Sequence, residues 1–212
     1  GMALGMKILA DKFSDGRASL FDSKVYVLAG DGCIMEGITS EASSLAGHLN
    51  LNNLIVIYDS NDICLDGPVD ECFSENTKQR YESYGWFVQT IDGHSFKNIN
   101  LAIEKAKGSK QPSLIIAKTV IGKGSPNFEG TSDVHGKALG EDEARKTKKA
   151  LKLPDDHLFY VPNEVKFFFE AHAIAQKKNY LSWQEQFHQW RMKHPQAAEL
   201  LESHHAPVNQ NA

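Results

Sequence analysis

The sequence has few cysteines, no excess of positive charge and no long hydrophobic run. Its three cysteines, Cys33, Cys64 and Cys72, are odd in number and have no metal-binding spacing, which indicates a reducing compartment, most simply the cytoplasm. The formal net charge of −4 provides no basic surface for nucleic acid or an anionic membrane. No apolar run approaches the roughly 20 residues of a membrane span, and a signal-peptide pattern is absent. We therefore expect neither nucleic acid nor a membrane as a partner.

Short apolar runs alternate with segments of helical spacing over the first 160 residues. The runs predict strands, and the segments beside them predict helices. The strands are expected at 24–29, 53–58, 85–91 and 113–119, and the helices at 1–10, 38–50, 73–84 and 96–107. This alternation predicts an α/β fold, with a doubly wound, mostly parallel sheet and helices on both faces.

The remaining sequence predicts a C-terminal helical appendage. Helices are expected at 140–151 and 162–177, and a third is expected to begin at Ser182, where the spacing to Glu185 is that of a capping box. Pro195 would end it.

Three segments follow from this pattern: an α/β domain over 1–160, a helical appendage over 161–205 and the start of a linker over 206–212. The helix at the beginning of the chain has no capping residue before it. We therefore expect the chain to be part of something longer, with an N-terminal part of the first domain missing.

The motif Gly30-Asp31-Gly32 lies between the first predicted strand and a helix. It places the Asp31 carboxylate at the carboxyl edge of the sheet, where open α/β sheets bind their ligands. The glycines allow the backbone to approach a ligand closely, and a helix start offers free amides to an anion. Alone the motif is weak, because such an aspartate often only caps the next helix.

Asn61 follows the next predicted strand, 61 − 31 = 30 residues after Asp31. If the two strands are neighbours, a carboxylate, an amide oxygen and a nearby carbonyl would lie together. Such oxygens suit Mg²⁺ or Ca²⁺, whose remaining positions would be taken by phosphates and water. Asn61 on its own is also explained as a turn residue. Taken together, the pair favours a metal site.

The pair and its flanking residues resemble the metal-diphosphate motif of thiamine diphosphate enzymes, and among them transketolase. The resemblance is carried, in the order of that family, by residues 30–38, 44–49, 66–67, 84–86, 92–94, 118–125 and 135–136. The pyruvate dehydrogenase first component and deoxyxylulose phosphate synthase share the metal motif but lack the continuation Cys33-Ile34-Met35-Glu36-Gly37.

The resemblance implies a thiamine diphosphate-binding fold and a transferase of the pentose phosphate pathway, which moves a two-carbon ketol group between ketose and aldose phosphates. It implies that Asp31, Asn61 and the Ile63 carbonyl hold Mg²⁺ or Ca²⁺ against the cofactor. The Gly32 amide would bind a phosphate oxygen. His135, in a long loop after the fourth strand, matches the family's active-site histidine, which contacts the diphosphate and the reacting end of the substrate.

The same resemblance implies partners. Glu36 and Glu41 match carboxylates at the family's homodimer interface, although two glutamates on a helix more often face solvent. In transketolases an earlier segment supplies histidines and a Gly-rich loop, and a later pyrimidine-binding domain supplies the glutamate that activates the cofactor. Since this chain contains neither, we expect it to be inactive alone.

Several alternatives remain open. One is another thiamine diphosphate enzyme, such as a phosphoketolase or a dihydroxyacetone synthase. Another is a non-catalytic cofactor-binding module that keeps the fold and the motif. A P-loop is excluded because residues 122–125 lack its spacing, and a dinucleotide-binding domain is disfavoured because Gly-x-Gly-x-x-Gly is absent after the first strand.

Overall fold

The computed structural model describes residues 1–13, 20–65 and 67–205, so the predicted linker at 206–212 lies outside the described residues. The chain divides into two compact units. The first contains Gly1–Lys7 and Ser23–Tyr160, and the second contains Ile8–Asp22 and the chain from Val161 onward. In the described ranges no helix is long and apolar enough to cross a membrane.

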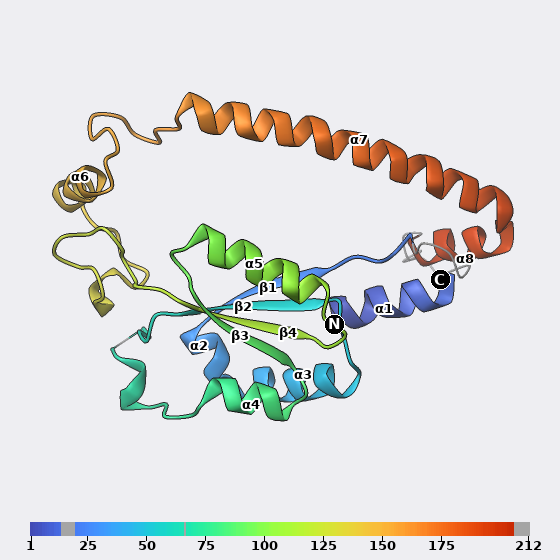
Figure 1. Cartoon of the computed structure of the whole chain (residues 1–212), viewed down its shortest axis with the longest axis horizontal. Coiled ribbons are helices and arrows are strands. Elements are labelled where there is room, and N and C mark those ends of the chain that lie inside the picture. The colour runs from blue at the N-terminus through green and yellow to red at the C-terminus, as the bar shows by residue number, and fades with distance from the viewer. Residues whose placement is uncertain (14–19, 66, 206–212) are drawn as a thin grey trace, which may run out of the picture. The chain divides into compact units, whose positions relative to one another are not determined.

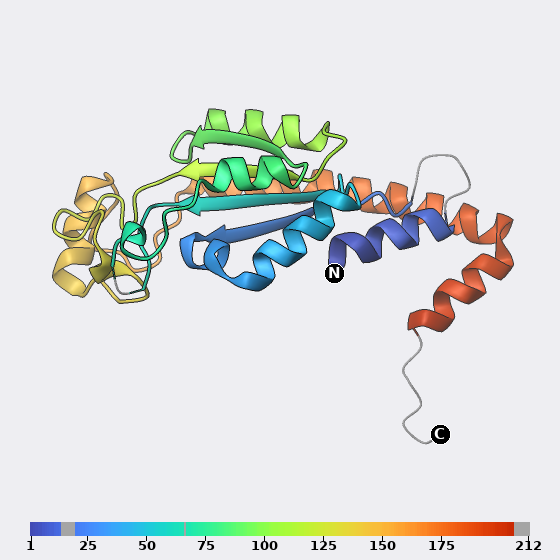
Figure 2. The same ribbon diagram turned by 90° about the horizontal axis from the view of Figure 1, so that it is seen from below.

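The first unit is built on a four-stranded parallel sheet with the strand order β1-β2-β4-β3 (Figure 1). Its strands are β1 (Val25–Gly30), β2 (Leu54–Ser60), β3 (Phe87–Asp92) and β4 (Ser113–Lys118). All four arrows point the same way in Figure 2, so their carboxyl ends meet at one edge of the sheet. The four predicted strands are confirmed, with small shifts at their ends.

Helices cover both faces of this sheet. The first face carries α5 (Phe96–Lys107), and the opposite face carries α2 (Asp31–Met35), α3 (Gly37–His48) and α4 (Thr77–Ser83) (Figure 1). Successive residues of a strand point to opposite faces, which is why the middle residues of β2 (54–58) and β4 (114–117) are all largely apolar. Ile55 and Ile115 pack under α5, whereas Val56 and Leu114 pack toward α3 and α4. The α/β fold predicted from the sequence is confirmed.

The strand β1 differs from the buried strand that its apolar sequence predicts. In the described sheet it pairs only with β2, and Tyr26 and Leu28 are 46% and 81% exposed. The helix α5 packs on β3 and β4, at the other end of the sheet. The prediction of burial is therefore wrong for this chain. Val25 and Ala29 pack against the core, but among the described residues no layer covers Tyr26 and Leu28.

The helix α3 is also oriented differently from the prediction. The stripe Ile38, Leu45 and Leu49 is exposed, although its spacing favours a core face. The buried residues of α3 are instead small ones: Ser43, Ala46 and Gly47. A β-carbon on Gly47 would lie 1.8 Å from the carbonyl oxygen of Tyr84, so only glycine permits this close packing. The buried face of α3 is thus its small-residue face.

One further helix boundary differs from the prediction. The helix α4 begins at Thr77 rather than Phe73, because the side chain of Asn76 caps it by accepting a hydrogen bond from the Gln79 amide at 3.0 Å. A short 3₁₀ turn, η1 (Val69–Glu71), precedes it. The predicted helix at 140–151 is confirmed as α6 (Glu141–Ala150), which follows a second 3₁₀ turn, η2 (Ser132–Val134).

The second unit is helical. It contains α7 (Asn163–Lys193), α8 (Pro195–His205) and the later part of α1 (Met2–Phe13). The sequence predicts two helices where the structure has the single α7, because nothing between Lys177 and Ser182 breaks a helix. Instead of capping a new helix, the Ser182 hydroxyl accepts a hydrogen bond from Gln186 one turn later.

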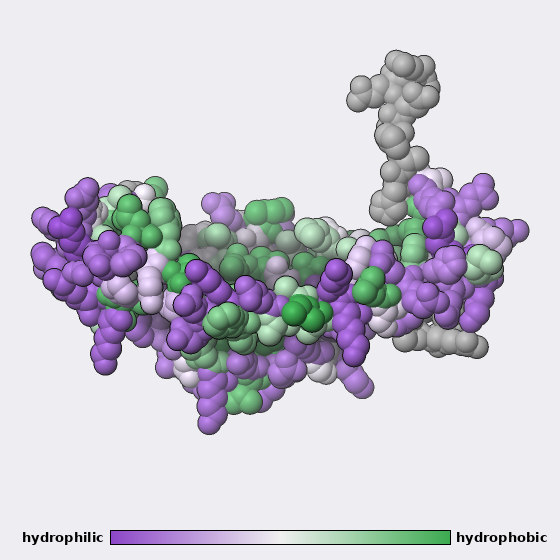
Figure 3. All heavy atoms as spheres, turned by 90° about the horizontal axis from the view of Figure 1, so that it is seen from above, coloured by the Kyte–Doolittle hydropathy of each residue, from purple (hydrophilic) through white to green (hydrophobic). Residues whose placement is uncertain are grey.

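A small aromatic core holds this unit together. Phe13 and Trp190 meet edge to face, with ring centroids 6.1 Å apart, and Leu201 is buried beside them. Most of α7 outside this core is exposed, and green hydrophobic residues are interspersed with purple hydrophilic ones on the face drawn in Figure 3. The exposed hydrophobic residues of α7 include Phe167, Phe168, Phe169, Ile174, Tyr180 and Leu181.

Candidate functional site

Asp31 lies where the sequence predicts, at the carboxyl end of β1 and at the start of α2. It is only 4% exposed. One carboxylate oxygen, Oδ1, accepts a hydrogen bond from the Tyr58 hydroxyl at 2.5 Å, and Oδ2 accepts one from the Asn61 backbone amide at 3.0 Å. The ends of β1 and β2 are therefore joined through this side chain.

The surroundings of Asp31 suit a cation. None of the ion pairs formed by the described residues includes Asp31, and both of its hydrogen-bond donors are neutral. Burial, and then the hydrogen bond to Asp31, raise the pKa of Tyr58, so the phenol keeps its proton and remains a donor. A buried carboxylate without a compensating positive charge is costly. A bound metal ion would supply that charge.

Asn61 and Ile63 form a tight turn beside Asp31. The side-chain oxygen of Asn61 accepts a hydrogen bond from the Ile63 amide at 3.1 Å, and Asp62 between them has a positive φ of 62°. Among the described residues, no hydrogen bond occupies the Ile63 carbonyl oxygen. Asn61 is therefore a turn residue, as one of the two explanations from the sequence requires. Its oxygen keeps a second lone pair, which leaves it able to act as a ligand.

This set of oxygens fits a hard divalent cation. Carboxylate, amide and carbonyl oxygens are the ligands that Mg²⁺ and Ca²⁺ take in proteins. Within the described ranges no three His, Cys, Asp or Glu side chains lie together in a way that could hold a metal. The predicted ligand set contains only one such side chain, Asp31. Its remaining ligands would be the oxygens of Asn61 and Ile63, together with phosphate and water.

A cavity of about 730 Å³ opens over this edge of the sheet. Its lining includes Asp31, Tyr58, Thr90 and several residues of the segment 68–78. Lys118, at the end of β4, also lines it and donates hydrogen bonds to the Ser60 hydroxyl at 2.8 Å and to Asp62 at 3.1 Å. The cavity is of the size used by small-molecule and cofactor sites.

Gly32 is the second residue of α2, and its amide is among the first amides of the helix, which have no partner within it. It can therefore face an anion. Glu36 and Glu41 are both exposed, and Glu36 is the N-cap residue of α3. They lie on the same helix as the exposed stripe that contains Ile38 and Leu45. The structure thus presents these carboxylates on a free surface of the described chain.

His135 lies in the long loop that follows β4, directly after η2. Its side chain is half-buried, and among the described residues its Nδ1 atom is buried without a hydrogen-bond partner. No hydrogen bond or ion pair in the described part of the chain joins His135 to Asp31 or Asn61. The structure therefore brings Asp31, Asn61 and Ile63 together, and it leaves His135 with an unpaired polar atom in a neighbouring loop.

Two contacts that the sequence analysis missed fix this loop. His94 accepts a hydrogen bond from the Val120 amide through Nε2 at 2.9 Å, at the start of the loop. Glu143, buried at the start of α6, accepts hydrogen bonds from the Ser125 hydroxyl at 2.6 Å and from the amide and side chain of Asn127 at 2.8 and 2.7 Å. These bonds, that of Ser125 first, lower the pKa of Glu143. An acidic residue in a first helical turn gives no sequence signal of such a role.

An open parallel sheet with a buried carboxylate at adjoining strand ends, under a cavity, defines an α/β ligand-binding domain. Comparison with known proteins narrows this class. Residues 1–207 match the family described as "Transketolase, thiamine diphosphate binding domain". The chain belongs to this transketolase family.

Relatives and solved structures agree with this assignment. The chain is 47% identical over 208 residues to a transketolase of Bacillus subtilis, covering 95% of this chain and 31% of that protein. It is 44% identical over 206 residues to a transketolase of Physarum polycephalum, covering 96% of this chain and 31% of that protein. A crystal structure of Pichia stipitis transketolase with sedoheptulose 7-phosphate matches with a TM-score of 0.92 at 36% identity. The match covers 99% of this chain and 32% of that one. The chain thus spans about a third of the length of these proteins.

Proposed function

We propose that this chain is the cofactor- and metal-binding part of a transketolase, which transfers a two-carbon ketol group between ketose and aldose phosphates. The observation that carries the proposal is the buried Asp31 carboxylate, bonded to the Asn61 amide at the shared edge of β1 and β2. Membership of the family supports it. Solved Pichia stipitis transketolases bound to fructose 6-phosphate and sedoheptulose 7-phosphate favour sugar phosphates as substrates.

The residues at the strand ends would hold the metal and the diphosphate. Side-chain oxygens of Asp31 and Asn61 and the carbonyl oxygen of Ile63 would bind Mg²⁺, or Ca²⁺. The Gly32 amide would donate to a phosphate oxygen. Thiamine diphosphate, when bound, supplies the nucleophilic carbon and the electron sink. The protein's part is to fix that cofactor and its charge in place.

His135 would contact the diphosphate and the reacting end of the substrate. An imidazole can donate to a phosphate oxygen and can take up or release a proton near neutral pH. Its unpaired Nδ1 atom is free for such a bond within the described structure. The bonds of Glu143 to Ser125 and Asn127 would keep the loop that carries His135 ordered.

The complete enzyme would contain more than this chain. A second subunit would cover Glu36 and Glu41 in a homodimer, as the exposed Ile38 and Leu45 on the same helix favour. A pyrimidine-binding domain would complete the site. Within this chain we propose an α/β domain over 1–160 and a helical appendage over 161–205, with a linker from 206, in a cytoplasmic enzyme.

Titration calorimetry with thiamine diphosphate tests the proposal. We expect binding to require Mg²⁺ and to weaken at least about tenfold in Asp31→Ala, since a metal ligand is lost. Asp142→Asn is the matched control, because Asp142 is an exposed acid on α6 of the same unit. Binding that is unchanged in Asp31→Ala, or independent of metal, would contradict the assigned site.

Product analysis with the complete enzyme separates transketolase from its relatives. Given xylulose 5-phosphate and an aldose phosphate, we expect a longer sugar phosphate. Acetyl phosphate formed with inorganic phosphate as acceptor would instead show a phosphoketolase. Dihydroxyacetone formed with formaldehyde as acceptor would show a dihydroxyacetone synthase. Cofactor binding without any product would indicate a non-catalytic module. The 212-residue chain alone should be inactive, and turnover of pentose phosphates by it unaided would contradict this.

A further inference from the structure

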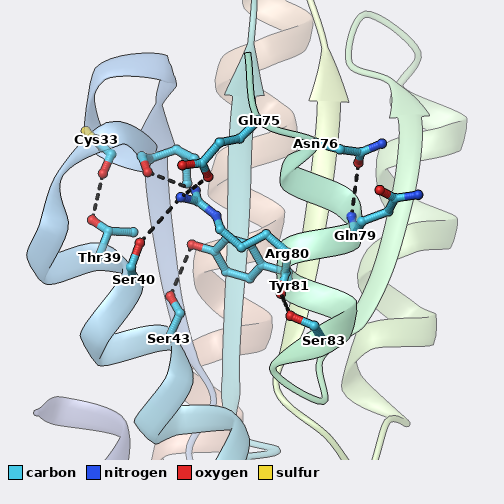
Figure 4. A network of polar contacts seen from close by, with 11 residues as sticks. Cys33, Thr39, Ser40, Ser43, Glu75, Asn76, Gln79, Arg80, Tyr81 and Ser83 are labelled. Atoms are coloured by element: carbon cyan, nitrogen blue, oxygen red, sulfur yellow. Dashed lines mark hydrogen bonds and ion pairs between the residues drawn. The ribbon is translucent and has the colours of Figure 1, made fainter. Parts of the chain in front are cut away.

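Arg80 connects α4 to the segment that follows Asp31 (Figure 4). Its side chain is 15% exposed. The guanidinium donates through Nη2 to the Ile34 carbonyl oxygen at 3.0 Å and through Nη1 to the Ser40 hydroxyl at 3.4 Å. The same Nη1 pairs with Glu75 at 2.7 Å. One side chain thus contacts α2, α3 and the segment before α4.

The carbonyl that Arg80 binds belongs to a helix of only five residues. The last carbonyls of a helix have no partner within it, and a cation is favourable at that end. The helix α2 begins with Asp31 and continues with Gly32, so its far end and the proposed metal and phosphate ligands are less than two turns apart. Fixing Ile34, which is fully buried, therefore fixes Asp31.

A second contact holds the neighbouring carbonyl. The Thr39 hydroxyl donates to the Cys33 carbonyl oxygen at 2.6 Å (Figure 4). Two late carbonyls of α2 are thus held from outside the helix, one from α3 and one from α4. The chain from Gly30 to Gly37, which we call the 30–37 turn, is therefore tied to α3 and α4 through these two carbonyls.

The geometry at Arg80 requires a guanidinium. Its planar group reaches Ile34 and Ser40 at once, which a lysine amine cannot do in the same way. It also stacks over Phe73, with 5.6 Å between the guanidinium carbon and the ring centroid. Its Nε atom is buried without a partner among the described residues, which is a cost. The two Nη contacts hold the group despite that cost.

We propose that Arg80 is a positioning residue of the cofactor site, holding the 30–37 turn so that the Asp31 carboxylate and the Gly32 amide face the metal and the diphosphate. The inference rests on the proposed function of that site. We assign the positioning of the turn to the hydrogen bond between Arg80 and the Ile34 carbonyl. The ion pair between Arg80 and Glu75 is not assigned this role, because Glu75 is 53% exposed and exposed ion pairs contribute little.

The test compares four variants of the 212-residue chain. Arg80→Met removes every polar contact, and Arg80→Lys keeps the charge. Glu75→Gln removes only the ion pair. Arg145→Met, on exposed α6 and paired one turn away with Glu141, is the control for loss of a surface arginine. Binding of Mn²⁺ with thiamine diphosphate is followed by electron paramagnetic resonance, and hydrogen exchange is measured at each amide, together with the unfolding midpoint.

In Arg80→Met we expect exchange at residues 32–37 to rise and Mn²⁺–thiamine diphosphate affinity to fall, each by at least about tenfold, the usual cost of losing a group that orients a ligand. Arg80→Lys should recover part of both losses. Glu75→Gln and Arg145→Met should stay within about twofold of the wild type, because surface pairs contribute so little. If Arg80→Met does not fold, a weakened but folded Arg80→Lys carries the same conclusion.

Three outcomes would overturn the inference: affinity unchanged in Arg80→Met, faster exchange spread evenly over β2 and β4 as well as the turn, or a loss in Glu75→Gln as large as that in Arg80→Met. Failure of the proposed function looks different. The wild type would then bind no Mn²⁺–thiamine diphosphate, while exchange in the 30–37 turn would still report whether Arg80 holds it.

Discussion

The hydroxyl of Tyr58 donates a hydrogen bond of 2.5 Å to Oδ1 of Asp31, from the end of β2 to the end of β1. Tyr58 is 5% exposed, and its raised pKa keeps the proton on the phenol at all physiological pH values. A hydrogen bond to a carboxylate is stronger than one between neutral groups. Tyr58 therefore orients the charged group on which the proposed metal site depends.

Replacing this phenol should weaken both stability and metal binding. In Tyr58→Phe we expect the free energy of unfolding to fall by about 1.5–3 kcal/mol, as for hydrogen bonds to charged groups. Affinity for Mg²⁺ with thiamine diphosphate should fall about tenfold. Urea unfolding and calorimetry measure the two effects. Tyr26→Phe is the control, since Tyr26 is half-exposed on β1, and an effect there as large as at Tyr58 would contradict the argument.

The contacts of Glu143 predict a pH dependence of the loop that carries His135. Because the pKa of Glu143 is lowered in the folded chain, its stabilising effect is fully present above the ordinary glutamate pKa of about 4.3 and is lost as the pH falls through the lower folded value. Protection of the Asn127 amide from hydrogen exchange should follow this course.

In Glu143→Gln the same protection should already be low at neutral pH. The control is Glu141→Gln, two residues earlier on the same helix and exposed, which should leave protection of Asn127 unchanged. Equal protection of Asn127 in Glu143→Gln and the wild type at neutral pH would show that the carboxylate does not hold the loop.

Gly122 offers a second way to disturb the same loop. Its φ is +63°, and a β-carbon there would lie 2.9 Å from Cγ2 of Val134, beside His135. Gly122→Ala should therefore destabilise the chain by more than about 1 kcal/mol, through both strain and contact. Gly136→Ala is the matched control, because Gly136 has φ +68° but open space around its β-carbon. Thermal unfolding should show the smaller loss for Gly136→Ala.

The sheet makes a simple prediction about its core. Leu114 on β4 is 0% exposed, so Leu114→Ala should lower the free energy of unfolding by about 2–5 kcal/mol. Leu28→Ala, on the exposed β1, should change it by about 0.5 kcal/mol or less. Urea unfolding distinguishes the two. Similar losses at both positions would mean that β1 is covered in solution.

Much of the fold follows from local sequence. The strands are short, mostly apolar runs that include β-branched or aromatic residues and lie between turn signals, and their ends fall close to the predicted positions. The proximity of Asp31 and Asn61 could also be predicted, because consecutive parallel strands bring their carboxyl ends to one edge. This inference needs only the order of elements and not the details of packing.

Other features depend on contacts that the local sequence does not encode. The sequence of β1 and the apolar stripe on α3 do not reveal whether other residues of this chain cover them. The roles of Arg80 and Glu143 arise from partners far along the chain, 46 residues away in the case of Ile34. The sequence does not predict the continuity of α7 through Ser182, because Ser182 and Glu185 have the spacing of a capping box although Ser182 caps no helix in the structure.

The open side of β1 has a practical consequence for handling this chain. Val25–Gly30 contains no proline and no charged residue, and along one side its amides and carbonyls pair with no other strand of the described sheet. Such an edge can template the addition of strands from other molecules. Purified alone, the chain should therefore self-associate as its concentration rises, and Leu28→Lys should suppress that association by placing a charge on the edge.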